Sequence, residues 1–185
     1  MLVGTLLNLG VNAAVATVVY HLQQDGTPLA TVGLVTTTIG VGMLLGSLAA
    51  PALLDRFPTG RLVVGGLLLG VLAFTVLPFV DGVPATLAVM GLGILGAPVA
   101  NAGLGGWFMA VVPGPLLGRA GSAVDLLSLA ALPLAPVVAG FGLSLVGLQG
   151  TLGVCAAVCL VAAVLLVGNR RLRRLSGPAG WADAL

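Results

Sequence analysis

Six long apolar runs dominate this sequence, and each is long enough to cross a lipid bilayer as a helix. About 20 consecutive apolar residues match the hydrocarbon core of a membrane, where helices and closed barrels are the structures that satisfy the backbone hydrogen bonds. The runs cover residues 2–20, 29–54, 62–80, 85–111, 122–146 and 151–168. We therefore predict an all-α integral membrane protein whose residues 1–168 form a bundle of six transmembrane helices.

Composition excludes an ordinary soluble domain. Hydrophobic residues make up 59% of the chain and charged residues 6%, whereas soluble domains carry about 25% charged residues. The 29 glycines suit a membrane bundle, in which small residues let helices approach closely. The formal net charge of +2 comes from loops and tail. It therefore indicates orientation in a lipid bilayer and no nucleic-acid partner.

Positive charge is confined to one side of the predicted bundle. It lies in the breaks after the second and fourth runs and in a basic tail, residues 169–185, whereas the other breaks hold none. Because basic residues favour the cytoplasmic side, we predict a multi-pass protein of the cell (cytoplasmic) membrane with the tail and both termini in the cytoplasm. The tail arginines act as a stop-transfer signal or bind anionic headgroups. The arginines are Arg56, Arg61, Arg119, Arg170, Arg171, Arg173 and Arg174.

Polar residues are unevenly distributed over the six runs. The first, second, fourth and fifth runs carry amides, several hydroxyls or an acid, but the third and sixth hold only Thr75 and Thr151. Polar groups in membrane helices usually face the bundle interior or a water-filled cavity. A three-helix unit that is repeated once must be inverted, because three crossings end on the opposite side of the membrane. The pattern predicts a 3+3 inverted repeat, a common transporter plan, with the third and sixth helices facing lipid.

Three asparagines are the candidate residues of a substrate cavity. Asn8 and Asn12 are one helical turn apart, so both amides share a face. Asn101 lies in a glycine-rich stretch after Pro98, and this proline predicts a kink. Each amide is interpreted either as part of a cavity wall or as an interhelical hydrogen-bonding group that serves packing alone.

Few residues in the runs could carry other chemistry. Asp125 follows Arg119 by six residues, so we interpret it as an interfacial charge, with proton coupling as the alternative. His21 suits an interfacial anchor. Cys155 and Cys159 share a helical face but lack the further ligands of a metal site, so packing is their predicted role. We expect no catalytic residues, metal or cofactor.

Two stretches carry a family resemblance. Residues 55–61, Asp-Arg-Phe-Pro-Thr-Gly-Arg, follow the second run and its small residues, and they resemble the loop signature of the major facilitator superfamily. Val112-Pro113, residues 117–120 (Leu-Gly-Arg-Ala), residues 132–134 (Leu-Pro-Leu) and Gly140 are similar to the tenth-to-eleventh helix region of its exporters, especially the macrolide and siderophore branch. The resemblance is to the C-terminal six-helix half of the family fold.

The resemblance implies a specific architecture and function. In the family, two six-helix halves surround a central cavity, so helices one, two, four and five here would line it. Asp55, Arg56, Arg61 and Arg119 would belong to cytoplasmic gate loops that contact the other half. We therefore expect the C-terminal half of a secondary transporter that exports small amphipathic molecules by alternating access. Its partners would be the bilayer, the small-molecule substrate, and a missing N-terminal half or a second copy.

Two alternatives belong to different functional classes. The chain is otherwise a transport-incompetent truncated half, or an accessory membrane protein that needs a partner half. The apolar start at Met1 favours a piece of a longer protein. An intramembrane serine protease is disfavoured because Ser122 and His21 lie towards opposite faces, whereas a Ser–His pair must reach hydrogen-bond distance. We therefore predict no enzyme.

Overall fold

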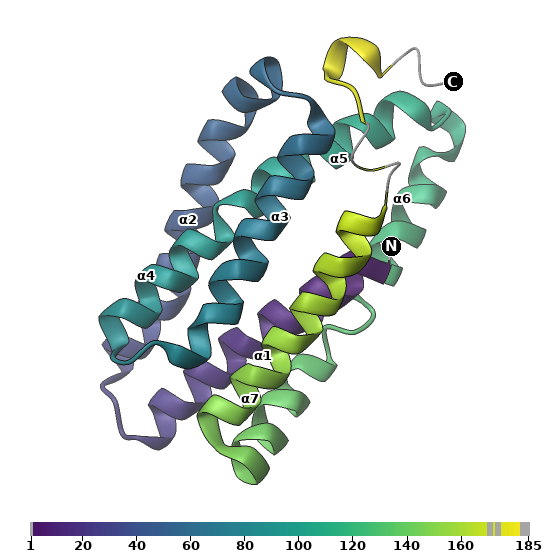
Figure 1. The fold of residues 1–185 in the computed structure, drawn as a ribbon. Coiled ribbons are helices and arrows are strands. Elements are labelled where there is room, and N and C mark those ends of the chain that lie inside the picture. Colours follow the sequence, from purple (N-terminus) through teal and green to yellow (C-terminus); the bar gives the residue numbers. More distant parts are fainter. Residues whose placement is uncertain (1, 170–171, 173–174, 182–185) are drawn as a thin grey trace.

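The computed structural model describes residues 2–169, 172 and 175–181, and every regular element in these residues is helical (Figure 1). The four tail arginines Arg170, Arg171, Arg173 and Arg174 lie outside the described residues. Within the described residues, seven α-helices and two short 3-10 helices (η) follow one another. They are α1 (Leu2–Gln24), α2 (Leu29–Arg56), α3 (Thr59–Val76), η1 (Leu77–Phe79), α4 (Val83–Ile94), α5 (Gly96–Val111), α6 (Gly114–Leu129), α7 (Leu134–Gly168) and η2 (Pro178–Gly180).

Five segments have the length and hydropathy of a membrane crossing. The first two are α1 and α2, and the other three are Thr59–Phe79, Val83–Val111 and Gly114–Gly168. The last segment has 55 residues, far more than the roughly 20 that one crossing needs. An all-α chain of long apolar helices is therefore confirmed, while the six crossings and the inverted repeat stay predictions.

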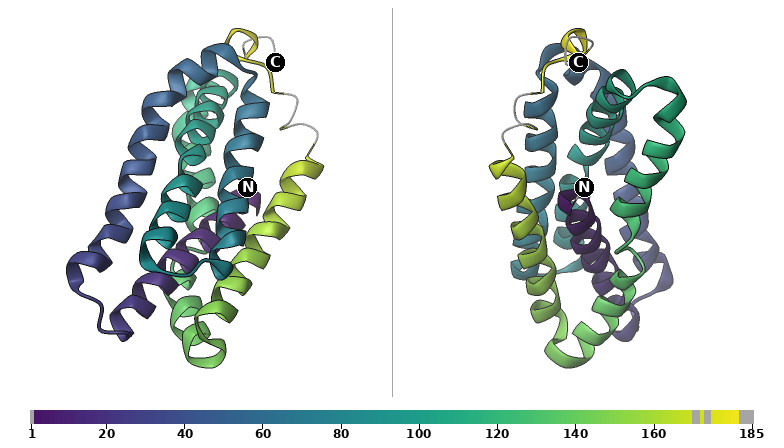
Figure 2. Two further views of the ribbon diagram at one scale, coloured as in Figure 1. Left: turned by 60° about the vertical axis from the view of Figure 1, so that its left-hand side comes forward. Right: turned by 90° about the vertical axis from the view of Figure 1, so that its right-hand side faces the viewer.

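Helix α7 consists of two stretches that lie side by side. At Gly147 the backbone has φ 70° and ψ −174°, outside the helical region, and glycine adopts such a positive φ without a steric penalty. A Cβ placed on Gly142 would contact the side chain of Thr151. The chain thus reverses at Gly147, as Figures 1 and 2 show.

Two of the predicted helices are interrupted in the structure. The predicted helix 85–111 is divided at Leu95, which is one turn before the expected kink at Pro98. Pro98 has no N–H for the carbonyl of Ile94, so the helical ladder loses a hydrogen bond there. The predicted helix 122–146 instead begins at Gly114 and is interrupted over residues 130–133. Pro133 likewise has no N–H for the carbonyl of Leu129.

Glycines surround the interruption at Leu95. A Cβ on Gly46 of α2 would meet the Leu95 carbonyl oxygen, and a Cβ on Gly96 would meet the backbone of Gly66 in α3. The interruption is therefore held between the backbones of α2 and α3. Helices approach this closely only where small residues leave room.

The same kind of contact joins α1 to the second stretch of α7. A Cβ on Gly10 would lie 2.6 Å from Sγ of Cys159 and 3.2 Å from the carbonyl oxygen of Cys155. Both cysteines are free thiols and are buried in this interface. Their positions agree with the predicted packing role.

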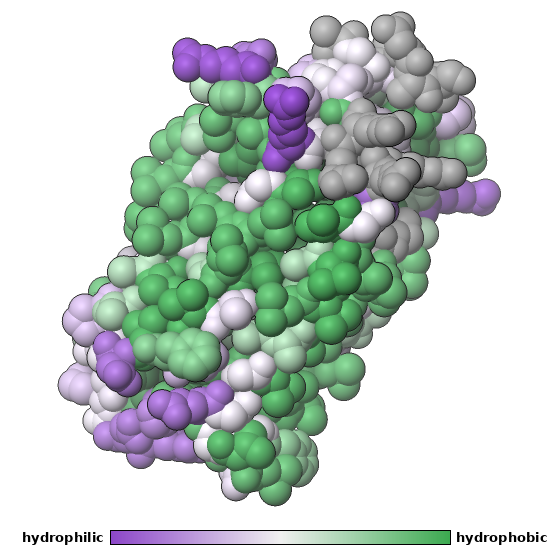
Figure 3. Space-filling view, in the orientation of Figure 1, coloured by the Kyte–Doolittle hydropathy of each residue, from purple (hydrophilic) through white to green (hydrophobic). Residues whose placement is uncertain are grey.

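The surface has an apolar belt between two polar ends (Figure 3). Large apolar side chains on several helices are exposed, among them Leu48 (70%), Leu126 (71%), Leu145 (78%) and Val164 (72%). Soluble proteins rarely expose so extended an apolar surface. The belt is what a protein embedded in hydrocarbon presents to the lipid.

Two neighbouring glycines of α3 provide a stability test. Replacing Gly66 by Ala would place a Cβ 2.6 Å from the Gly96 carbonyl oxygen, so we expect a loss of about 1–3 kcal/mol from overpacking. Replacing Gly65 by Ala meets nothing within 4 Å and removes a glycine's helical penalty of about 1 kcal/mol. The midpoint temperature of thermal unfolding, measured on the purified protein in detergent, should therefore fall for G66A and not for G65A. Equal effects would contradict the proposed contact.

Candidate functional site

A polar seam joins α1 to the interrupted end of α6. We define the seam as Thr5, Asn8 and Asn12 of α1 with Asp125 and Ser128 of α6. Thr5 Oγ1 donates to the carbonyl oxygen of Leu127 at 2.6 Å, and Asn8 Nδ2 donates to that of Ser128 at 3.2 Å. Two polar side chains of α1 thus bind the last turn of α6.

These hydrogen bonds satisfy backbone carbonyl groups at the C-terminal end of α6. The last four carbonyl groups of a helix have no partner within it, and α6 ends at Leu129. The carbonyl of Leu129 accepts from the N–H of Leu132 at 2.9 Å in the following turn. Thr5 and Asn8 supply donors for the two carbonyls before it. The interruption of α6 is therefore stabilised from α1.

Asn8 and Asn12 have different surroundings. Asn8 is partly buried and makes the interhelical hydrogen bond that was one of its two predicted roles. Asn12 is exposed, and its Nδ2 donates to the carbonyl oxygen of Asn8 at 2.8 Å within α1. That bond leaves the Asn12 side-chain carbonyl as an acceptor on the outer face of the seam.

Asp125 lies in the second half of α6. Arg119 is inside α6 and not in a loop, because the helix already begins at Gly114. Eleven residues separate Gly114 from Asp125, which corresponds to about 16 Å along the helix axis. Asp125 is exposed, and no ion pair joins it to another of the described residues. A carboxylate inside a membrane-spanning helix and without a cationic partner is costly unless it binds a proton or a ligand, so whether Asp125 is interfacial or couples protons stays a prediction.

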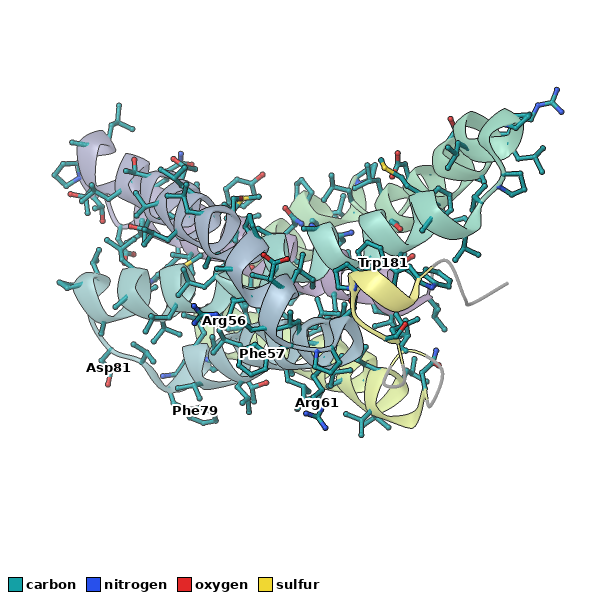
Figure 4. All side chains as sticks on the ribbon, turned by 90° about the horizontal axis from the view of Figure 1, so that it is seen from above. Arg56, Phe57, Arg61, Phe79, Asp81 and Trp181 are labelled. Atoms are coloured by element: carbon teal, nitrogen blue, oxygen red, sulfur yellow. The ribbon has the colours of Figure 1, made fainter. Side chains whose placement is uncertain are left out.

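Asn101 belongs to a different part of the bundle. It is exposed on α5, and α5 packs against α2 and α3, whereas α1 packs chiefly against α7 and α6. Seen along the bundle, α2 and α6 lie in two diverging arms (Figure 4). The structure therefore places Asn8 against the last turn of α6, with Asn12 and Asp125 one turn away on the same two helices, and leaves Asn101 on another helix.

The predicted gate residues lie on helix ends and are exposed. Asp55 and Arg56 are in the last turn of α2, and Arg61 is in the first turn of α3, so all three lie at one end of the bundle (Figure 4). We call this the arginine end. Arg119, in α6, is also exposed. Within the described part of the chain these four charges form no ion pair, so they are open to a partner.

The opposite end holds a feature that the sequence did not predict. His21 Nε2 lies 3.2 Å from Asp25 Oδ2. Beside this pair, two neighbouring cavities of about 460 and 320 Å³ share Pro78, Asp81 and Gln149. The signal available in the sequence was the placement of Asp81 and Gln149 in breaks without arginine. No group of three metal-binding side chains occurs among the described residues.

Comparison with known proteins gives one family. A sequence model described as the Major Facilitator Superfamily matches residues 1–183, which is nearly the whole chain. No curated protein matches the chain. The family match therefore covers all the described helices, including the seam and the arginine end.

The hydrogen bond of Asn8 predicts an asymmetric effect of two substitutions. Asn8→Ala removes the donor to Ser128 at the end of α6, and an interhelical hydrogen bond of this kind contributes about 0.6–1.7 kcal/mol. Asn12→Ala removes a bond within one helix and should change stability less. The measurement is thermal unfolding of both variants in detergent. An Asn12 variant that is less stable than the Asn8 variant would contradict this reading of the seam.

Proposed function

The chain belongs to the major facilitator superfamily, and from this premise we propose that it forms the C-terminal half of a secondary transporter. The superfamily consists of membrane transporters and not of enzymes, so the prediction of no enzyme is confirmed. It is thus a multi-pass membrane protein of a family that transports small molecules. Everything finer in this section is our proposal.

The proposed architecture has six crossings in two inverted triplets. The reversal at Gly147 supports a sixth crossing, because it divides a 55-residue apolar segment into stretches that lie side by side. The exposed arginines of the arginine end favour its cytoplasmic location. Both termini then lie in the cytoplasm, and the membrane is the cell membrane.

The interrupted end of α6 is the observation that carries the proposed mechanism. Interrupted helices near the middle of a bilayer are recurring elements of transporter binding sites. Here the interruption is held by Thr5 and Asn8, and Asp125 lies about one turn away on the same helix. We assign Asn8 and Asn12 to the wall of a substrate cavity and Asp125 to proton coupling. Asn101 would line the same cavity from α5.

The proposed substrate is a small amphipathic molecule, moved outward by alternating access. The seam offers amides and one acid, whereas most of the surrounding surface is apolar. Such a lining suits a molecule with a large apolar body and few polar groups. Outward transport rests on the resemblance of residues 112–140 to exporters.

The gate charges support the need for a second half. Asp55, Arg56, Arg61 and Arg119 are exposed and unpaired among the described residues, and α6 contains no buried residue. Both features fit a surface that meets an N-terminal half or a second copy. The alternative function, a truncated or accessory half that does not transport alone, rests on this same observation.

Transport itself is tested in proteoliposomes with a fluorescent amphipathic dye and an imposed pH gradient. Asp125→Asn cannot exchange a proton, so we expect the gradient-driven rate to fall about tenfold or more. Asp81→Asn changes an acid at the opposite end of the bundle and serves as the matched control. Undiminished gradient-driven transport by D125N would refute coupling through Asp125. Absence of transport by the parent protein, both alone and together with its partner half, would refute the proposed function.

The partner half is tested through the arginine end. Arg56→Gln combined with Arg61→Gln should lower the yield of chemical crosslinking to the partner and reduce transport. The thermal stability of the chain should stay unchanged, because both side chains are exposed and unpaired among the described residues. A particle mass near 18.2 kDa for transport-active protein, after subtraction of detergent, would show that no partner is needed.

A further inference from the structure

The described part of the C-terminal tail returns to the arginine end of the bundle. We call residues 175–181 the strap. The carbonyl oxygen of Leu175 accepts a hydrogen bond of 3.1 Å from the N–H of Gly60, the second residue of α3. The first N–H groups of a helix lack partners within it. The strap therefore caps α3 next to Arg61.

The strap is also folded on itself. Trp181 Nε1 donates to the carbonyl oxygen of Ser176 at 3.0 Å, and the N–H of Gly180 donates to that of Gly177 at 2.9 Å. These bonds close the short helix η2 and present the indole ring as one side of a compact loop. Figure 1 shows this C-terminal segment at the end of the bundle where α2 joins α3, the arginine end.

The indole ring lies on α5. A Cβ placed on Gly106 would be 2.6 Å from Cη2 and Cζ3 of Trp181, so glycine is what lets the ring lie on the helix. One turn earlier, a Cβ on Gly103 would be 2.9 Å from Cγ2 of Thr59. The strap thus bridges α3 and α5 at the place where these helices already touch.

From this bridge we infer that the strap is an autoinhibitory clamp on the arginine end, and this inference rests on the proposed transport function. Its two anchors are on different helices, so α5 cannot move away from the start of α3 without breaking the Leu175 hydrogen bond or displacing Trp181. Helix α5 leads through Val112 and Pro113 into α6, which carries Arg119 and Asp125. Release of the strap therefore precedes opening at this end.

Neighbouring glycines of α5 allow a matched test. A side chain at Gly106 would displace the indole ring, because its Cβ would be 2.6 Å from that ring, whereas a Cβ on Gly105 meets nothing within 4 Å; we therefore compare Gly106→Leu with Gly105→Leu. In a Trp107→Phe background Trp181 is the only remaining tryptophan, so acrylamide quenching of fluorescence reports its exposure. We expect quenching in the whole protein to rise several-fold for G106L and to stay unchanged for G105L. Equal quenching in both variants would overturn the assigned contact.

A second readout follows α5 independently of transport. Ala102 is exposed on α5, and Ala102→Cys can be labelled with a water-soluble maleimide, with native Cys155 and Cys159 as background. Added G106L should raise the labelling rate several-fold and added G105L should not. An unchanged labelling rate with G106L would overturn the inference of a clamp even if Trp181 is released.

Dye transport by the same glycine variants, without A102C, should be faster for G106L. A parent protein that transports neither alone nor with its partner half would refute the proposed function, whereas the labelling result tests the clamp alone.

Discussion

Backbone contact between helices at glycine is the constraint on which the rest of this fold depends. The interruption at Leu95 lies between Gly46 and Gly66, and α1 meets the second stretch of α7 at Gly10. Water supplies no driving force between helices in lipid, so close packing and hydrogen bonds must hold the bundle together. The polar groups that remain are few, and their positions therefore carry information. They concentrate at the two ends and along the seam between α1 and α6.

The interruption of α6 combines interhelical hydrogen bonds with the proposed functional residue Asp125. Pro133 removes a hydrogen bond from the ladder, and Thr5 and Asn8 satisfy carbonyl groups that the helix end exposes. A broken helix in a membrane is tolerated only with such partners. The result is a local polar environment beside Asp125, within a segment that is otherwise apolar. The strap at the arginine end likewise contacts the bundle at few points, through the Leu175 carbonyl group on α3 and the Trp181 indole ring on α5.

The helical class, the apolar segments and the family could be predicted from the sequence, because run length and the loop at residues 55–61 are local signals. The interruptions could not be placed, since prolines are tolerated in membrane helices and neighbouring helices decide what each one does. Asp125 was interpreted as interfacial from its distance to Arg119, and this stays a prediction; the structure adds that both residues lie on one helix that starts at Gly114. The pairing of Asn8 with Ser128 joins residues 120 positions apart, and no local pattern reports such a contact.

The position of Asp125 in α6 also has an electrical consequence. A charge that crosses the whole membrane potential changes in energy by about 2.3 kcal/mol per 100 mV. In the proposed coupling mechanism, a proton that reached Asp125 from either face would cross only part of that potential. Proton binding at the seam would therefore depend on voltage as well as on pH. The bundle would then respond to the energised state of the membrane through a single carboxyl group.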